Sequence, residues 1–264
     1  LGAPIFERTT RGVMLTAFGR DVYHQAQDIC QRFAYLQNAP KTSKAEHLSV
    51  SSMYCSLAND AFVEMFTRHY DDEFTCNLEE CMLFDVIRKV STGLTEIGVV
   101  TIFSDGEALA LRKLEDAGLE FNLILRRPLH AIIGPQNPLY HEERESVTLE
   151  ELREFPCVIN YAFPGDFSGE RIWEGGARRN AEVLVSDLGS ALQIVSRTGA
   201  VAIDTYDAET YRTFYAANDC KYLALKDAPI DCKLGWVMPK NHTLSQACGE
   251  FLEILREKAE LTAR

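Results

Sequence analysis

The sequence lacks both a long apolar run and a secretion signal. None of its 264 residues lies in an apolar stretch close to the roughly 20 residues that span a bilayer. Runs such as residues 97–104 have the length of a buried strand. Residues 1–11 carry charges and a proline instead of a basic start followed by an apolar core. These absences predict a protein of the cytoplasm.

Paired cysteines are also missing. None of the eight cysteines belongs to a CxxC pair, which predicts reduced thiols in a chain of this size. They are Cys30, Cys55, Cys76, Cys81, Cys157, Cys220, Cys232 and Cys248.

Enzyme signatures are absent as well. The six histidines show no HxH or HExxH spacing, and there is no G-x-S-x-G elbow or Walker-type loop. The glycine turn at 174–177 has no phosphate-binding lysine. We therefore expect no enzyme activity, no cofactor and no metal. A Cys–His pair assembled by the fold is the one catalytic alternative that this pattern leaves.

Charge is distributed unevenly. The net charge is −12, yet residues 1–47 hold six basic and four acidic residues, so the rest of the chain carries −14. An acidic body repels nucleic-acid phosphates. Any contact with DNA is therefore expected in the first segment.

A long helix is expected from Thr16 to Asn38. Thr16 is a good N-cap residue, and Pro40 prevents the helix from continuing. Apolar residues recur at spacings of 4, 3, 4 and 3, as in a coiled coil: Val22, Ala26, Ile29, Phe33 and Leu36. A narrow apolar seam needs a partner. We favour a second copy of this helix over packing on the following domain, because residues 39–47 read as a polar linker.

Strands and helices alternate after the linker, which indicates parallel sheets with right-handed crossovers. Two α/β lobes joined by crossing strands form a clamshell. The expected strands are 48–52, 74–78, 97–102, 119–125, 129–134, 157–161, 181–186, 201–205 and 233–238, and the expected helices are 57–70, 83–91, 149–154, 167–175, 188–197 and 245–260.

Two motifs carry a resemblance to a known family. Leu1-Gly-Ala-Pro-Ile-Phe-Glu-Arg8, followed by Leu15-Thr16 and Gly19, resembles the LG-x-x-[LI]F-x-R and LT-x-x-G pattern of LysR-type bacterial transcription regulators. Gly93 to Gly98 is similar to the family's G-x-[LI]-D-[LV]-[AG], with Thr95 and Glu96 in place of the usual aliphatic residue and aspartate. The resemblance covers the whole chain, strongly in residues 1–38 and by the order of elements thereafter.

The resemblance implies an α/β fold, a two-lobed effector domain like the type II periplasmic binding proteins. A long linker helix and the remnant of an all-α winged helix-turn-helix domain would precede it. The implied parts are a wing (1–16), a linker helix with hinge (17–47), lobe one (48–127), lobe two (128–237) and a return to lobe one (238–264). The implied partners are promoter DNA, a small-molecule effector and further copies of the chain, as a dimer or tetramer.

The implied contacts with DNA are incomplete. The family's recognition helix would lie in roughly 40 residues before Leu1. The wing residues Arg8, Thr9, Thr10 and Arg11 can contact phosphates, which positions a protein without reading sequence. We therefore expect these 264 residues to bind DNA weakly and without sequence preference.

An effector should bind between the lobes, where parallel strands end and helices begin. The candidates are Ser52, Met53, Tyr54, Cys55, Ser56, Cys81, Met82, Leu83, Thr101, Phe103, Phe163, Asp187 and Ile203. The set contains no lysine or arginine. A carboxylate effector would depend on helix amino ends and hydroxyls, whereas an uncharged or amine-bearing effector near Asp187 or Asp204 fits equally well. Ser56 is expected to face solvent, and each Met or aromatic side chain could instead pack in the core.

Two further alternatives remain open. Cys55 and Cys81 could together sense oxidants or soft metals, although buried structural thiols are favoured. The chain could also be a solute-binding protein of the same clamshell fold with no role on DNA. Such a protein should be monomeric, while a regulator should be at least dimeric.

Overall fold

The computed structural model describes residues 1–10, 12–38, 46–160, 182–185, 187–205, 218–228 and 231–262. Arg11, Phe163 and the helix expected at 167–175 lie outside these residues. The chain divides into two compact units, Leu1–Glu46 and His47–Arg264. In the part that the structure describes, no helix has the length and apolarity needed to cross a membrane.

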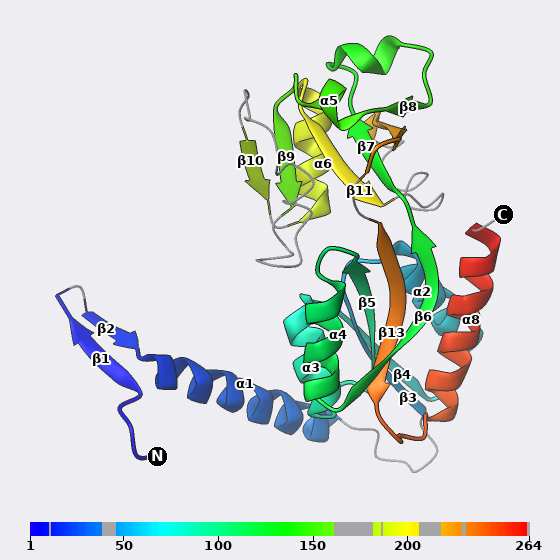
Figure 1. Ribbon diagram of the computed structural model, residues 1–264. Helices are drawn as coiled ribbons and strands as arrows, with labels where there is room; N and C mark the ends of the chain where they lie inside the picture. Colours follow the sequence, from blue (N-terminus) through cyan, green and yellow to red (C-terminus); the bar gives the residue numbers. More distant parts are fainter. Residues whose placement is uncertain are drawn as a thin grey trace. The chain divides into compact units, whose positions relative to one another are not determined.

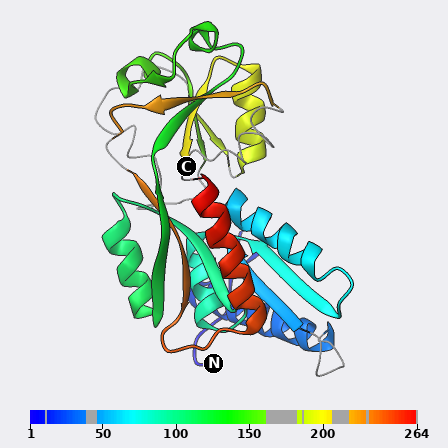
Figure 2. The same ribbon diagram turned by 90° about the vertical axis from the view of Figure 1, so that its right-hand side faces the viewer.

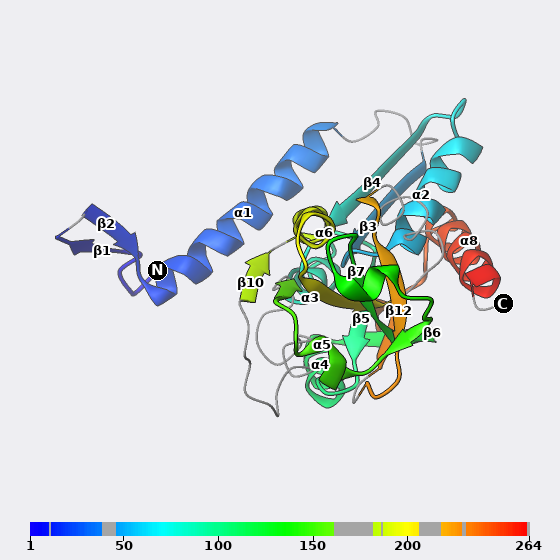
Figure 3. The ribbon, with the colours of Figure 1, turned by 90° about the horizontal axis from the view of Figure 1, so that it is seen from above.

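The first unit is a β-hairpin followed by one helix (Figure 1). Strands β1 (Phe6–Thr9) and β2 (Gly12–Leu15) pair antiparallel, and both are exposed. Helix α1 (Ala17–Asn38) runs without interruption, as Figure 3 shows. The expected long helix is confirmed, and the hairpin lies within residues 1–16, for which a wing was predicted.

A small joint connects the hairpin to α1. The Thr16 hydroxyl accepts a hydrogen bond from the Gly19 amide at 2.8 Å and donates one to the Pro4 carbonyl at 2.7 Å. A Cβ on Gly19 would lie 1.9 Å from the Ile5 carbonyl oxygen, so only glycine fits there. The Thr and Gly of the LT-x-x-G motif therefore cap the helix and permit a close backbone crossing.

The second unit begins with a five-stranded sheet in the order β4-β3-β5-β13-β6. Its strands are β3 (Glu46–Ser52), β4 (Phe74–Glu80), β5 (Ile97–Phe103), β6 (Leu119–Arg127) and β13 (Cys232–Pro239). Helices α2 (Ser56–Arg68) and α8 (Gln246–Thr262) pack together on one face (Figure 2). Helices α3 (Leu83–Ser91) and α4 (Glu107–Asp116) cover the other face.

A second sheet has the order β10-β9-β11-β7-β12-β8. Its strands are β7 (Leu129–Ile133), β8 (Ser146–Val147), β9 (Cys157–Asn160), β10 (Glu182–Val185), β11 (Val201–Thr205) and β12 (Lys221–Leu225). Helix α6 (Leu188–Arg197) packs on one face. The short α5 (Leu149–Leu152) and the 3-10 helix η1 (Pro138–His141) pack on the other. The two-lobed α/β architecture is confirmed.

Two strand crossings join the sheets. The chain passes from β6 into β7 and returns through β13, which pairs antiparallel with both β5 and β6. This return begins at Cys232, six residues before the expected boundary at 238, because all of β13 belongs to the first sheet. Phe103 and Cys232 nevertheless pack in the core of the second sheet. The Ser104 amide donates to the Asp231 carbonyl at 2.9 Å, which ties the end of β5 to the start of β13.

The two glycines of the 93–98 motif are required for different structural reasons. Gly93 ends α3 with φ of +71°, in the left-handed region that favours glycine. A Cβ on Gly98 would lie 2.2 Å from Cγ1 of Val86, so α3 packs against β5 only where no side chain intervenes.

Thr95 and Glu96, the two residues that depart from the family motif, each interact with a specific residue elsewhere in the fold. Oγ1 of Thr95 lies 3.0 Å from Oγ of Ser51, and both side chains are buried. The Glu96 carboxylate accepts hydrogen bonds from the Ser245 amide and hydroxyl, the latter at 2.7 Å. Thr95 therefore pairs with a buried hydroxyl on β3, and Glu96 fastens the start of α8.

We predict that Thr95→Val destabilises the protein by about 1–3 kcal/mol, because it leaves the buried Ser51 hydroxyl without this partner. Ser51→Ala should also destabilise it. The double variant should cost less than the sum of the two, since it removes both polar groups. Urea unfolding curves with unchanged slope measure this. Strictly additive losses would show that the two hydroxyls do not interact.

Candidate ligand-binding site

The connections after β3 and β4 lie side by side. The Cys81 amide donates to the Ser52 carbonyl at 2.9 Å, and the Met53 amide donates to the Val99 carbonyl at 2.9 Å. Helices α2 and α3 begin just after these bonds, and their N-cap residues, Cys55 and Met82, provide no side-chain cap. The first turns of two helices are thus brought together at one edge of the sheet, as the sequence predicted.

Most side chains of the first loop point into the protein. Ser56 is only 5% exposed, so the expectation that it faces solvent is wrong. It is the first residue of α2, and its neighbours along the helix belong to the core between α2, α8 and the sheet. Ser52, Met53, Cys55 and Leu83 are buried as well, while Tyr54, Cys81 and Met82 are half-buried.

The third expected loop is part of a strand. Because β5 extends through Phe103, Thr101 and Phe103 lie within the sheet instead of after it. Thr101 is half-buried, and Phe103 is a core residue of the second lobe. The connection that follows begins at Ser104, whose hydroxyl accepts from the Asp231 amide at 3.1 Å.

From the second lobe, Asp187 caps α6. Its carboxylate accepts from the Ser190 amide at 2.8 Å, and these helix-end hydrogen bonds lower the pKa of Asp187. Ile203 is half-buried against the same core cluster as Phe103. The structure therefore leaves Asp187 as the exposed polar candidate from this lobe.

The sequence did not single out Glu80, the last residue of β4. Partial burial raises its pKa, and repulsion from Asp187 raises it further. Two carboxyl groups, one from each lobe, thus approach closely enough to interact. Their negative potential opposes an anion and favours a neutral or positively charged group beside them.

His130 was also missed. It lies on β7 opposite Asp204 of β11, and its ring meets the Tyr222 ring edge-on at 5.8 Å. Burial lowers the His130 pKa, which favours the neutral imidazole. Only the pairing of β7 with β11 and β12 places these residues together.

Cys55 and Cys81 do not have the properties of a redox-sensing pair. Burial raises the pKa of Cys81 to about 12, with smaller contributions from Glu79 and Asp85, so the thiol is neutral at pH 7. Cys55 is buried. Over the described ranges of the chain, no group of three His, Cys, Asp or Glu residues could hold a metal ion.

We predict one rapidly alkylated thiol per folded chain, that of Cys30, which is exposed on α1. Cys81 should react with iodoacetamide only after unfolding, because a thiol with a pKa of about 12 holds little thiolate at pH 8. Peptide mass spectrometry after brief labelling measures both, and Cys30→Ser should remove the fast reaction. Rapid labelling of Cys81 in the folded protein would contradict the neutral-thiol assignment.

Comparison with known proteins identifies the fold. The model of the LysR substrate binding domain matches residues 75–260. CbnR bound to its target DNA is similar over 98% of this chain and 85% of its own, with a TM-score of 0.57 and 17% identity. The effector-binding domain of QuiR with shikimate matches over 83% and 99%, with a TM-score of 0.59 and 13% identity. HinK from Pseudomonas aeruginosa matches over 93% and 81%, with a TM-score of 0.62 and 12% identity.

A search of curated proteins found no match to the sequence. The structural likenesses, all at low identity, show a shared fold. The family model goes further, because its match runs from β4 to α8 and takes in both sheets. On that match, the chain belongs to the LysR family of transcriptional regulators and contains the family's substrate-binding domain.

Proposed function

We propose that this chain is a LysR-type DNA-binding transcription regulator whose second unit senses a small-molecule effector. The observation that carries the proposal is the family match over residues 75–260, together with the hairpin and long helix that precede it. CbnR, similar over nearly the whole chain, was solved on its target DNA, and the QuiR domain was solved with shikimate. A regulator of this kind works on DNA, so we place it in the cytoplasm and assign it no enzyme activity.

The hairpin is the proposed DNA-contacting wing. Arg8, Thr9 and Thr10 are exposed towards its tip, and the Thr9 hydroxyl donates to the Gly12 carbonyl at 3.2 Å. Arg11 lies outside the described residues. One basic and two hydroxyl side chains suit phosphate contacts, which fix position without reading the base sequence.

Helix α1 is the proposed dimerisation element. Ile29 is 67% exposed and Phe33 is 61% exposed, although both are large and apolar. Val22 is half-buried and Ala26 is exposed, while the side chain of Leu36 lies outside the described set. An exposed apolar seam at coiled-coil spacing supports pairing with a second copy of the chain.

The effector is proposed to bind between the two lobes, at the connections after β3 and β4 and at the start of α6. The whole candidate set belongs to this proposal. Its described members that are not buried are Tyr54, Cys81, Met82, Thr101, Asp187 and Ile203. The backbone N–H groups of α2 and α3 could bind an acceptor group of the effector. Beside Glu80 and Asp187, an uncharged or amine-bearing part fits better than a carboxylate.

We predict that Ile29→Glu with Phe33→Glu abolishes association through α1, because it would bury unpaired charges in an apolar seam. Multi-angle light scattering should show the parent at a multiple of 29.7 kDa and the variant at a smaller multiple. His24→Glu with Gln27→Glu adds the same charge off the seam and should keep the mass of the parent. If the seam variant keeps that mass too, the assignment of α1 fails.

We predict that Met82→Trp weakens binding of any stabilising metabolite by at least about tenfold, because the indole fills space beside the start of α3. Leu123→Trp is the control, since Leu123 is 51% exposed on β6, away from these connections. A thermal-shift screen finds the metabolite, and titration compares the variants. Equal affinity in the parent and both variants would place the effector elsewhere.

A further inference from the structure

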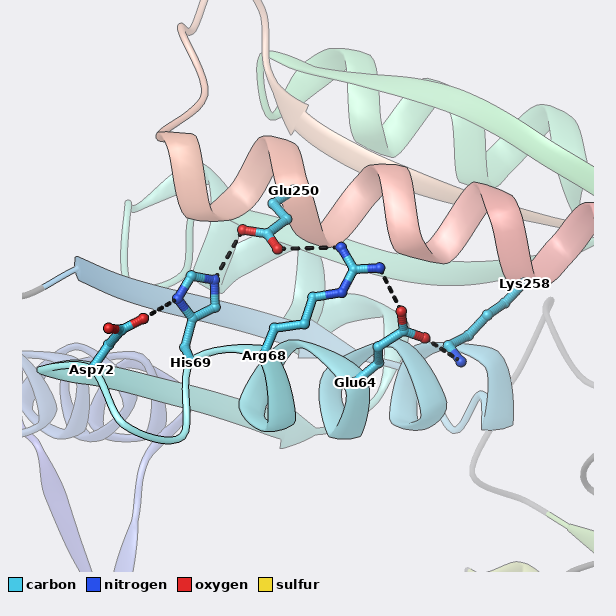
Figure 4. Close-up of polar contacts among 6 residues, drawn as sticks. All are labelled: Glu64, Arg68, His69, Asp72, Glu250 and Lys258. Carbon is cyan, nitrogen blue, oxygen red and sulfur yellow. Dashed lines mark hydrogen bonds and ion pairs between the residues drawn. The ribbon is translucent and has the colours of Figure 1, made fainter.

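A network of charged side chains joins α2 to α8 (Figure 4). Arg68 pairs with Glu64 of its own helix at 2.6 Å and with Glu250 of α8 at 3.4 Å. Lys258 of α8 reaches back to Glu64 at 2.9 Å. The two helices are therefore linked along their shared surface by charges of alternating sign.

His69, the residue that ends α2, lies at one end of this network. Its Nδ1 is 3.0 Å from the Asp72 carboxylate, and its Nε2 is 2.9 Å from the Glu250 carboxylate (Figure 4). A neutral imidazole has one N–H and one lone pair, so it can donate to only one of the two. The imidazolium donates to both. The observed geometry thus fits the protonated ring.

The surroundings of His69 also favour the proton. Each element packed against the ring contributes a side chain. Helix α8 supplies Glu250, and α2 supplies Arg68, which also contacts Glu250. The turn after α2 supplies Asp72, and β4 supplies Phe74. The Phe74 ring stacks on the imidazole at 4.7 Å and holds its plane. The hydrogen bond with Glu250 raises the pKa of His69 most, burial opposes it, and Asp72 adds to the rise.

We propose that His69 is a proton-operated latch that fastens the end of α2 to α8. In the protonated state, one side chain bridges the turn, α2 and α8. When the ring loses its proton, one nitrogen presents a lone pair to a carboxylate about 3 Å away, and that contact becomes repulsive. The pair Arg68–Glu250 then remains as the contact at this end of the helix pair.

The direction of the pH dependence follows from linkage. The pKa of folded His69 is raised above its ordinary value of 6.5. The stability that the latch contributes is therefore complete below pH 6.5 and is lost as the pH rises through the folded pKa. Its operating range lies between 6.5 and the raised pKa of the folded protein.

The latch also bears on the other end of α2. This helix runs from Ser56, beside the proposed effector loop, to Arg68, next to His69. Because a helix of this length moves largely as one body, the position of its end and that of its start are coupled. Release of the latch at His69 therefore changes how firmly the start of α2 is held, although His69 does not contact the proposed effector loop.

The test uses the full chain without DNA or effector, so its result does not depend on the proposed function. Long-range proton–nitrogen NMR of the His69 ring should show both nitrogens protonated at pH 6 and a folded pKa above 6.5. In Glu250→Gln the pKa should fall, because the largest cause of the rise is removed. A single protonated nitrogen at pH 6, or a pKa at or below 6.5 in the parent, would overturn the latch.

Hydrogen exchange supplies the second measurement. After correction for intrinsic rates, the amides of the last turn of α2 should exchange several-fold faster at pH 8.5 than at pH 6.0 in the parent. In His69→Gln, whose amide can donate hydrogen bonds but does not titrate, the ratio should be close to one. His24→Gln, on exposed α1, is the matched control and should behave as the parent. Equal ratios in the parent and His69→Gln would refute the proposal, and the NMR arm decides it if His69→Gln does not fold.

Discussion

The second unit depends on the return of β13 between β5 and β6. This strand is antiparallel to both neighbours, whereas β3 and β5 run parallel, so β13 closes the first sheet only after the chain has built the second. Cys232 starts β13 but packs with Phe103 in the core of the second sheet, and Ser104 is bonded to Asp231 just before it. The two sheets therefore share one buried joint. The ends of β3 and β4 belong to one lobe and the start of α6 to the other, so this joint connects the elements that carry them.

The sequence predicted helix ends and close backbone contacts best where a capping residue or a glycine determines the local geometry. Thr16, the expected N-cap residue, accepts a hydrogen bond from the Gly19 amide, and α1 was predicted to within a residue. Helix α6 was also predicted correctly, although its cap by Asp187 was not foreseen. Some elements without such signals were missed, among them α4 and β12. Helix α4 buries only Ala110 and Leu114 among many apolar residues, so its periodicity is weak. Strand β12 is five residues long and pairs with β7 and β8, far away in the sequence.

The site was predicted at the level of loops but not of side chains. Parallel strands and helix starts fixed which connections meet, since topology alone brings them to one edge. Whether a side chain faces the solvent or the core depends on packing. The packing of α2 and α3 buries Ser56 and Met53, and Phe103 is buried in the core of the second lobe. Glu80 and His69 acquired their roles from Asp187 and Glu250, which are distant in the chain. No spacing rule reports an interaction between residues more than 100 positions apart.

Helix α2 connects the proposed effector loop with the charged network that contains His69. Its first turn follows Cys55 in the proposed effector loop, and its last turn ends in the charged network with α8. Between them, Leu57, Ala58, Ala61 and Met65 are fixed in the core, so the helix cannot bend to absorb a displacement at one end. Coupling between two sites is reciprocal. If protonation of His69 alters the loop at Tyr54, an effector bound at that loop must alter the proton affinity of His69 by the same factor. Under this proposal, α2 is the element through which the two sites exchange that effect.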